Sequence, residues 1–239
     1  MMIKLAISGA RGRMGQAIAA LAEADPELHI TTLLEHAEHP DVTKTFHGVP
    51  LSADNATIAE CGALIEFTLP EGTIRNLQSA VAHKVPIVIG TTGFTAEQLR
   101  EIETAAQKIP LVLASNMSIG VNTLFKLIEI AGSKISPAAV TISETHHIHK
   151  KDKPSGTAKT MAQIAEQASG LKIPNIESLR EGEVIGDHTI CFESAEDVLT
   201  ITHHAKDRSM FARGALTAAK FLQNKKPGLY TMQDVLGLR

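Results

Sequence analysis

The first half of the chain alternates short apolar runs with segments in which apolar residues recur every three or four positions. The runs have the length of buried strands, and the segments between them have the spacing of helices. Nearly continuous apolar strands separated by helices are typical of a parallel sheet covered on both faces. The predicted strands are Ile3–Ser8, Ile30–Glu35, Ala63–Thr68, Pro86–Thr91 and Leu111–Ser115, and the predicted helices are Met14–Ala24, Thr73–Ala82 and Ala96–Gln107.

The second half of the chain has a different pattern. A long helix is predicted first, followed by strands that alternate polar and apolar residues, with a single clear helix among them. Such alternation fits a sheet with one face in water or in an interface. The predicted elements are the helix Ile119–Ser133, the strands Ala139–His147, Val184–Glu193 and Val198–Lys206, and the helix Gly156–Ala168.

This change of pattern near residue 117 predicts two domains. Residues 1–117 form the first domain, and residues 118–208 form the second. A helical pattern returns from Phe211 onward, which indicates that residues 209–239 pack back onto the first domain and complete it. The sequence contains no internal repeat and no Gly/Ser linker.

The composition of the 239 residues is that of a globular protein, with 44% hydrophobic and 21% charged residues. A formal net charge of −3 gives no reason to expect nucleic acid or an anionic membrane as a partner. No apolar run is long enough to span a bilayer, and the first residues break into glycines too early for a secretory signal. The two cysteines, Cys61 and Cys191, are interpreted as reduced thiols of a cytoplasmic protein.

A glycine loop, SGARGRMG, follows the first predicted strand and precedes a predicted helix. Gly9, Gly12 and Gly15 would let the backbone turn tightly and approach a pyrophosphate at the start of the helix. The acid Glu35 lies about 20 residues further on, where it would hydrogen-bond an adenosine ribose. A glycine triplet alone also suits an ordinary turn between a strand and a helix. Strand, glycines, helix and acid together predict a dinucleotide site and a Rossmann-type doubly wound sheet.

The preference for NADH or NADPH is left open by this motif. Glu35 would repel a ribose 2′-phosphate and so favours NADH, whereas Arg11, Arg13 and His36 lie close enough in the sequence to soften that repulsion. Further loops at the ends of predicted strands carry hydroxyl and amide groups that suit a nicotinamide, in Gly90-Thr91-Thr92 and around Asn116. The alternative for the first of these loops is a plain helix start, in which Thr95 is the N-cap.

The stretch ETHHIHKKDKPSGTAKT, from Glu144 to Thr160, concentrates histidines and lysines before a predicted helix start. As a strand, Ala139–His147 places Glu144 and His146 on one face and His147 on the other. Lys150 follows in a loop, and the helix start can hold a carboxylate on its N–H groups. We interpret this stretch as a site for an acidic small molecule, with a histidine for proton transfer and a lysine to neutralise charge.

The histidine–lysine stretch allows two other interpretations. A metal site is disfavoured because adjacent strand histidines diverge and no acid or cysteine completes a set, so no metal is predicted. A solvated basic loop is the usual fate of a charge cluster, and the helix start beside it argues for a function instead. His188, His203 and His204 are interpreted as interface or surface residues without chemistry.

Taken together, these motifs resemble the dihydrodipicolinate reductase family along the whole chain. The resemblance is carried by GARGRMG, EFTLPEG, VIGTTGF, ASNMSIGVN, GEVIGDHT and FARGALTAAKFL, and above all by the pattern H-H-x-x-K-x-D-x-P-S-G-T-A from His146 to Ala158. It implies an α/β fold, with a Rossmann-type dinucleotide-binding domain and an α+β domain, built on a mixed open sheet, for substrate binding and oligomerisation. It also implies a homotetramer in the cytoplasm.

The resemblance further implies reduction of 4-hydroxy-tetrahydrodipicolinate, or of its dehydrated ring, to tetrahydrodipicolinate by NADH or NADPH in diaminopimelate and lysine biosynthesis. The substrate would be a cyclic dicarboxylate, with no nucleic-acid or membrane partner. His146 and Lys150 match the family's acid/base pair, and His147, Gly156 and Thr157 match its substrate contacts. The matching cofactor contacts are Gly9, Ala10, Arg11, Gly12, Arg13, Met14, Glu35, Gly90, Thr91, Thr92, Ala114, Ser115, Asn116 and Met117.

Two alternatives remain open at the level of the sequence. The chain could be another two-domain NAD(P)-dependent dehydrogenase that acts on an acidic amino-acid precursor. It could also be a dinucleotide-binding regulator without catalysis. A substrate panel separates the first from the reductase, and binding of NADH without its oxidation would identify the second.

Overall fold

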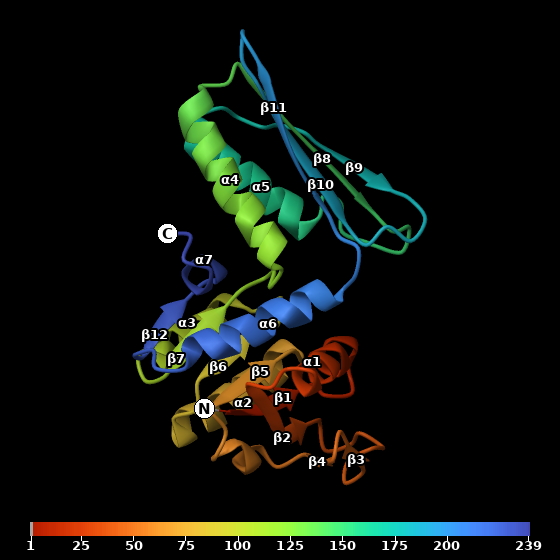
Figure 1. Cartoon of the computed structure of the whole chain (residues 1–239), viewed down its shortest axis with the longest axis vertical. Helices are drawn as coiled ribbons and strands as arrows, with labels where there is room; N and C mark the ends of the chain where they lie inside the picture. Colours follow the sequence, from red (N-terminus) through yellow and green to blue (C-terminus); the bar gives the residue numbers. More distant parts are fainter. Residues whose placement is uncertain (1) are drawn as a thin grey trace. The chain divides into compact units, whose positions relative to one another are not determined.

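The computed structural model describes residues 2–239, and Figure 1 traces the chain. The chain divides into two compact units. Unit 1 consists of residues 2–118 and 209–237 with Arg239, and unit 2 consists of residues 119–208 with Leu238. Unit 1 is therefore built from two separate stretches of sequence.

Unit 1 is organised around an eight-stranded sheet in the order β12-β7-β6-β5-β1-β2-β4-β3. All neighbouring strands pair in parallel except β3 and β4. The order reverses at β1, which lies between β5 and β2, so the carboxyl ends of these strands border a topological switch point. The strands are β1 (Ile3–Ser8), β2 (Leu28–Leu34), β3 (Thr45–Phe46), β4 (Val49–Ser52), β5 (Ala63–Glu66), β6 (Ile87–Ile89), β7 (Pro110–Leu113) and β12 (Gly228–Tyr230).

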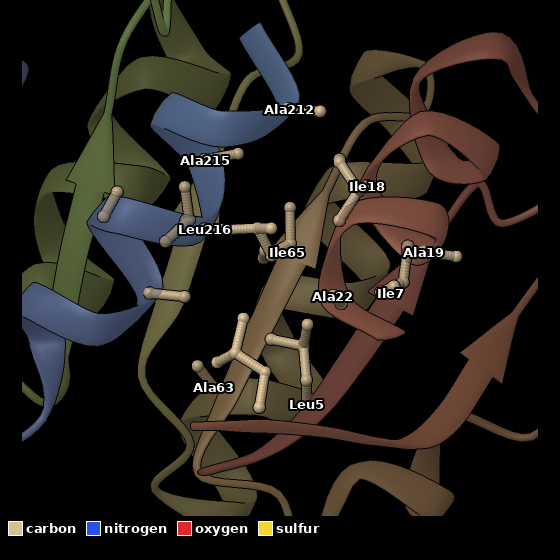
Figure 2. Packing of buried hydrophobic residues seen from close by; sticks show 14 of the residues in the cluster. Leu5, Ile7, Ile18, Ala19, Ala22, Ala63, Ile65, Ala212, Ala215 and Leu216 are labelled. Atoms are coloured by element: carbon tan, nitrogen blue, oxygen red, sulfur yellow. The ribbon is translucent and has the colours of Figure 1, made fainter. Parts of the chain in front are cut away.

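Helices cover both faces of this sheet. Helices α1 (Arg13–Glu23) and α6 (Ser209–Leu222) lie against one face, where α6 contacts α1 and the central strands. Figure 2 shows Ala212, Ala215 and Leu216 of α6 facing the side chains of β1, β5 and α1. Helices α2 (Pro70–His83) and α3 (Ala96–Ala106) contact strands β5, β6, β7 and β12. They pack on the opposite face of the sheet, against strand residues such as Leu64 and Ile87. The stretch after residue 208 thus supplies part of the core of unit 1.

Unit 2 is a four-stranded sheet in the order β11-β10-β8-β9 with two helices. The pairs β10–β11 and β10–β8 are antiparallel and β8–β9 is parallel, so the sheet is mixed. Helices α4 and α5 contact one face of the sheet and enclose Ile142, Ile190 and Phe192. The elements are α4 (Ile119–Ile135), β8 (Ala139–His146), α5 (Gly156–Ser169), β9 (Ile176–Arg180), β10 (Asp187–Glu193) and β11 (Val198–His204).

The predicted fold class, a mostly parallel sheet with a second mixed sheet, is confirmed. Each predicted strand and helix is present, with ends shifted by a few residues, and Thr95 caps α3 as expected. The prediction missed short elements whose pattern is weak. These are β3, β4, β9 and β12, the 3₁₀ turn Asn55–Ile58 and α7 (Met232–Val235).

Within residues 2–239, no helix combines the length and the apolar character that crossing a membrane requires. The same part of the chain contains no group of three His, Cys, Asp or Glu side chains arranged to hold a metal ion. Cys61 is buried, Cys191 is half-buried, and both are free thiols.

Candidate functional site

The glycine loop after β1 depends on its glycines for close backbone contact. Gly9 has φ +70°, and a Cβ atom there would lie 2.4 Å from the carbonyl oxygen of Phe67. At Gly15 a Cβ atom would lie 2.2 Å from the carbonyl oxygen of Gly9. Helix α1 begins after Gly12, which makes no side-chain capping bond to the first turn. The loop therefore presents a helix start without a side-chain cap, which suits a pyrophosphate.

Glu35 stands directly after β2 beside this loop. Its carboxylate accepts the backbone N–H of Arg11 at 3.2 Å and that of His36 at 3.1 Å. Ala10 in turn donates its N–H to the carbonyl of Leu34, so the glycine loop and the end of β2 are tied together. Arg13 is exposed and Met14 is half-buried. The residues expected to contact the pyrophosphate and the ribose thus lie side by side at one edge of the sheet.

The remaining expected cofactor contacts lie after β6 and β7. Gly90 leaves space for the ring of Phe67, which would be 2.2 Å from a Cβ atom there, and Ala114 donates its N–H to the carbonyl of Ile89. The Thr91 side chain is buried, and its hydroxyl is bonded to the N–H of Thr68 and to the Thr73 hydroxyl. Its hydroxyl is therefore engaged within the fold.

The other members of these two loops differ in exposure. Thr92 and Ser115 are exposed, and the side-chain oxygen of Asn116 accepts the N–H of Ser118. Met117 is 2% exposed and belongs to the hydrophobic core of unit 1. We therefore expect Met117 to reach a cofactor through its main chain, and Thr92 through its side chain.

A buried carboxyl group that the sequence pattern does not reveal lies beneath these loops. Glu66 ends β5, is fully buried, and accepts hydrogen bonds from Asn76 at 2.7 Å, from Thr73 at 3.3 Å and from Thr68. Burial raises the pKa of Glu66, and the hydrogen bonds only partly oppose this effect. Because Thr73 also bonds Thr91, the group supports the loops that end β5 and β6.

These residues fit a nicotinamide dinucleotide. The uncapped start of α1 and the close approach at Gly9 provide for phosphates, Glu35 provides acceptors for ribose hydroxyls, and exposed hydroxyl groups end the strands beyond them. This arrangement is confined to unit 1.

In unit 2, Glu144 is the centre of a buried polar cluster. The Arg180 guanidinium donates to both of its carboxylate oxygens, at 3.1 and 3.0 Å, and Ser155 donates its backbone N–H at 3.2 Å. His146 forms a short hydrogen bond to Glu144 through Nδ1. As predicted, Glu144 and His146 point to the same face of β8, two residues apart. The Glu144 bond leaves Nε2 as the ring nitrogen of His146 that can exchange a proton.

The charges in this cluster set the protonation of both groups. Burial alone would raise the pKa of Glu144, but the bonds from Arg180 and His146 hold that pKa below its usual value. Burial lowers the pKa of His146, and the Lys150 and Arg180 charges lower it further against the pull of Glu144. At neutral pH the cluster therefore consists of an ionised Glu144, a cationic Arg180 and a neutral His146.

Arg180 also fixes the loop that carries Lys150. Its guanidinium donates to the carbonyl oxygens of Lys150, at 3.3 Å, and of Asp152. The Lys150 ammonium pairs with the Asp152 carboxylate at 2.8 Å, and its side chain is 24% exposed. Arg180 was missed because it ends the unpredicted strand β9, and no local signal connects it to a loop 30 residues earlier.

Gly156 and Thr157, two of the expected substrate contacts, begin the helix beside this cluster. Ser155 caps α5 through its side chain, so Gly156 and Thr157 form the first turn, whose N–H groups face the helix end. A Cβ atom at Gly156 would meet nothing within 4 Å, which leaves open space at this position. His147 is half-buried after the end of β8, and its Nδ1 is buried without a hydrogen-bond partner. The structure thus groups His146, Lys150, Gly156 and Thr157 around Glu144, whereas His147 follows the last residue of β8.

The interpretation of His188 as a surface or interface residue was wrong. Its side chain is 4% exposed, its Nε2 lies 3.2 Å from the Ser155 hydroxyl, and its ring meets that of His146 edge to face at 5.0 Å. Burial, followed by the nearby His146, lowers the pKa of His188 to about 4. His188 pairs across the strands with Glu144, which the sequence pattern of β10 alone does not reveal.

We expect the neutral, buried His188 to make the stability of the protein depend on pH. Since its pKa falls from 6.5 in the unfolded chain to about 4 in the folded chain, the unfolded chain takes up the proton first as the pH decreases. The free energy of unfolding should therefore be about 2 kcal/mol lower near pH 5 than near pH 7 through this group. Urea unfolding at both pH values, compared between wild type and His188→Asn, measures this contribution.

The control for this measurement is His29→Asn, which removes an exposed histidine on β2. It should leave the pH dependence unchanged, whereas His188→Asn should flatten it. An equally steep dependence in His188→Asn and in wild type would contradict a histidine that is held neutral by burial.

Comparison with known proteins covers the whole chain. The family model described as dihydrodipicolinate reductase, N-terminus, matches residues 3–117, and that described as dihydrodipicolinate reductase, C-terminus, matches residues 120–236. The 4-hydroxy-tetrahydrodipicolinate reductase of Syntrophotalea carbinolica is 42% identical, with 100% of both chains covered. That of Burkholderia lata is 40% identical, with 99% of this chain and 100% of the relative covered.

A solved structure of a dihydrodipicolinate reductase agrees with this result. The dipicolinate-bound dihydrodipicolinate reductase from Paenisporosarcina sp. TG-14 superposes with a TM-score of 0.86 and 25% identity, over 98% of this chain and 99% of the other. A myo-inositol dehydrogenase from Corynebacterium glutamicum has a TM-score of 0.62 and 14% identity, over 100% of this chain and 93% of the other. The second likeness concerns the fold alone.

Proposed function

Because the chain belongs to the dihydrodipicolinate reductase family, we propose that it reduces the 4-hydroxy-tetrahydrodipicolinate ring, or its dehydrated form, to tetrahydrodipicolinate. The reductant is NADH or NADPH, and the reaction belongs to diaminopimelate and lysine biosynthesis. The observation that carries the proposal is the match of both family models across the chain. The cluster around Glu144 supports it with chemistry suited to an acidic ring.

In this proposal unit 1 holds the dinucleotide. The start of α1, from Gly9 to Met14, receives the pyrophosphate, and Glu35 accepts hydrogen bonds from the adenosine ribose. The loops at residues 90–92 and 114–117 face the nicotinamide end. When bound, the reduced nicotinamide supplies a hydride to an electron-poor ring.

Unit 2 supplies charge and a proton. Lys150, together with the N–H groups of Gly156 and Thr157 and with His147, binds the substrate carboxylates and steadies the negative charge that develops during reduction. Because His146 is neutral at rest, an arriving dianion favours its charged form and raises its pKa. Proton uptake at Nε2 of His146 is thereby coupled to substrate binding, and His146 then donates this proton to the reduced ring. Glu144 keeps the ring oriented through Nδ1.

We also propose that the protein is a cytoplasmic homotetramer built through the sheet of unit 2. One face of this sheet carries α4 and α5, and Leu179 and Val198, which lie on the opposite face, are 48% and 59% exposed. Threonines of three strands share this uncovered face, and a semi-apolar face of this kind suits pairing with another copy. Sedimentation velocity should give a mass four times that of the chain, and a monomer at micromolar concentration would contradict the proposal.

The free thiols of Cys61 and Cys191 fit a reducing compartment.

The test of the reaction is spectrophotometric. Freshly formed product of dihydrodipicolinate synthase is supplied with NADH or with NADPH, and the loss of absorbance of the reduced nicotinamide is followed. Turnover with at least one of them is expected. No turnover with either dinucleotide would contradict the proposed function.

A further inference from the structure

An ion-pair cluster lies beside the ribose acid Glu35, in the segment that links β2 to β3. Asp41 accepts a hydrogen bond from Arg11 Nε at 3.1 Å with one oxygen, and one from the Lys44 ammonium at 2.6 Å with the other. The Arg11 guanidinium lies 3.9 Å from the centroid of the Phe46 ring. Asp41 is therefore the group that binds both cations of this cluster.

Asp41 is not among the expected cofactor contacts, so those contacts do not explain why it binds two cations. Its side chain is 21% exposed and that of Arg11 is 29% exposed, so the pair is partly shielded from water. The backbone N–H of Asp41 is also held, by Nδ1 of His39 at 3.1 Å, which fixes the position of the carboxylate. An ion pair at the surface that keeps part of its contact with water contributes about 0–1 kcal/mol to stability, so this arrangement bears more on recognition than on folding.

The two nicotinamide dinucleotides differ only at the ribose that Glu35 is expected to contact. NADH presents a 2′-hydroxyl, which a carboxylate accepts well, whereas NADPH presents a 2′-phosphate, which a carboxylate repels. A 2′-phosphate is bound where an arginine can offer it the planar fork of its guanidinium. Arg11 is adjacent to Glu35, since its backbone N–H is bonded to that carboxylate, so it is the arginine placed for this role.

Asp41 competes for Arg11 and Lys44. A 2′-phosphate would have to displace a carboxylate that already bonds both side chains, and the carboxylates of Asp41 and Glu35 both repel it. The Lys44 ammonium and Arg11 hold the pKa of Asp41 below its usual value, so the carboxylate is ionised at neutral pH. The other charged or titratable groups of the segment are His36, Glu38 and His39, while Arg13 begins α1 and His47 follows β3.

We infer that Asp41 is a specificity-determining residue that disfavours NADPH by occupying Arg11 and Lys44, and so favours NADH. This inference rests on the proposed use of a nicotinamide dinucleotide. The preference for NADH over NADPH then depends on a residue that is neither part of the glycine loop nor the ribose acid Glu35. Phe46 has a supporting role, because its ring lies against the guanidinium that Asp41 binds.

The test measures binding directly, by titration calorimetry of the full-length protein with NADH and with NADPH. Wild type should bind NADH more tightly than NADPH. Asp41→Asn should lower the Kd for NADPH about tenfold, the effect expected of a freed charge-assisted hydrogen bond, and should change the Kd for NADH less than about twofold. Asp41→Ser is a second variant that also removes the carboxylate, should the asparagine variant fold poorly.

Two controls separate specificity from general charge. Glu38→Gln removes an exposed carboxylate of the same segment and should leave the ratio of the two Kd values unchanged. Arg11→Ala, combined with Asp41→Asn, should abolish the gain for NADPH.

The outcomes distinguish this inference from the proposed function. Binding of both dinucleotides by wild type, with an unchanged ratio in Asp41→Asn and Asp41→Ser, would overturn the inference and leave the function intact. An equal weakening of both would show that Asp41 only holds the segment in place, and would overturn it too. Failure of wild type to bind either dinucleotide would overturn both.

Discussion

Lys150→Ala is expected to lower kcat by about 10²–10³-fold, because it removes a positive charge that steadies the developing anion. The Kd for NADH should change less than about twofold, since the dinucleotide residues belong to unit 1. Steady-state kinetics with enzymatically generated substrate give kcat, and calorimetry with NADH gives the Kd. The loop itself should persist, because Arg180 binds the carbonyls of Lys150 and Asp152 rather than the lysine side chain.

Lys151→Ala is the matched control for this prediction. It removes an identical charge from the next position, where the side chain is exposed. Its kcat should stay within about twofold of wild type, as expected for a solvated charge. A normal kcat in Lys150→Ala, together with a large rise in the Kd for NADH, would place the lysine in dinucleotide binding instead.

Arg180→Leu is expected to lower the free energy of unfolding by about 3–5 kcal/mol at neutral pH, because it leaves the fully buried Glu144 carboxylate without its cationic partner. Urea unfolding followed by circular dichroism measures this loss. Arg180 helps to hold the pKa of Glu144 in the folded protein below its value in the unfolded chain. The stabilisation of the folded state by this pair is therefore complete above the unfolded pKa and is lost as the pH falls through the folded pKa. The difference between wild type and variant should accordingly shrink at acidic pH, where Glu144 becomes protonated in the variant.

Lys172→Leu provides the comparison for this loss. It breaks an ion pair with Glu166 in the same unit, in which the lysine side chain is 89% exposed, and should cost less than about 1 kcal/mol. Equal losses of unfolding free energy in Arg180→Leu and Lys172→Leu would indicate that the buried ion pair of Glu144 contributes no more to stability than an exposed one. A loss in Arg180→Leu that stays constant down to acidic pH would also contradict this account.

The fold of unit 1 was predictable because its central strands are short, apolar and separated by helical spacing. The periodicity of unit 2 was predictable only in part. Strand β9 has five residues, only one of which is buried, and it follows a loop, so its pattern is too short to recognise. Its pairing with β8 is a contact between distant parts of the chain that no local pattern encodes.

The candidate site shows the same division between local and long-range information. One stretch contains His146, Lys150 and the start of α5, and its high content of histidine and lysine makes it recognisable in the sequence. Arg180 and His188 reach the same cluster from other strands, and their roles depend on strand register. Glu144 was visible as a neighbour of His146 on one strand face, which is a signal that could have been weighed more heavily. Glu66 gave no signal at all, since a glutamate that ends an apolar run is usually exposed.

The interrupted course of the chain through unit 1 has a consequence for biosynthesis. Helix α6, which supplies Ala212, Ala215 and Leu216 to the core, is translated only after residues 119–208 of unit 2. Until it emerges from the ribosome, the face of the sheet that α6 covers stays unprotected, and nascent chains are open to aggregation or chaperone capture. Unit 1 can therefore complete its fold only after α6 has been synthesised, whereas residues 119–208 of unit 2 can fold before that point.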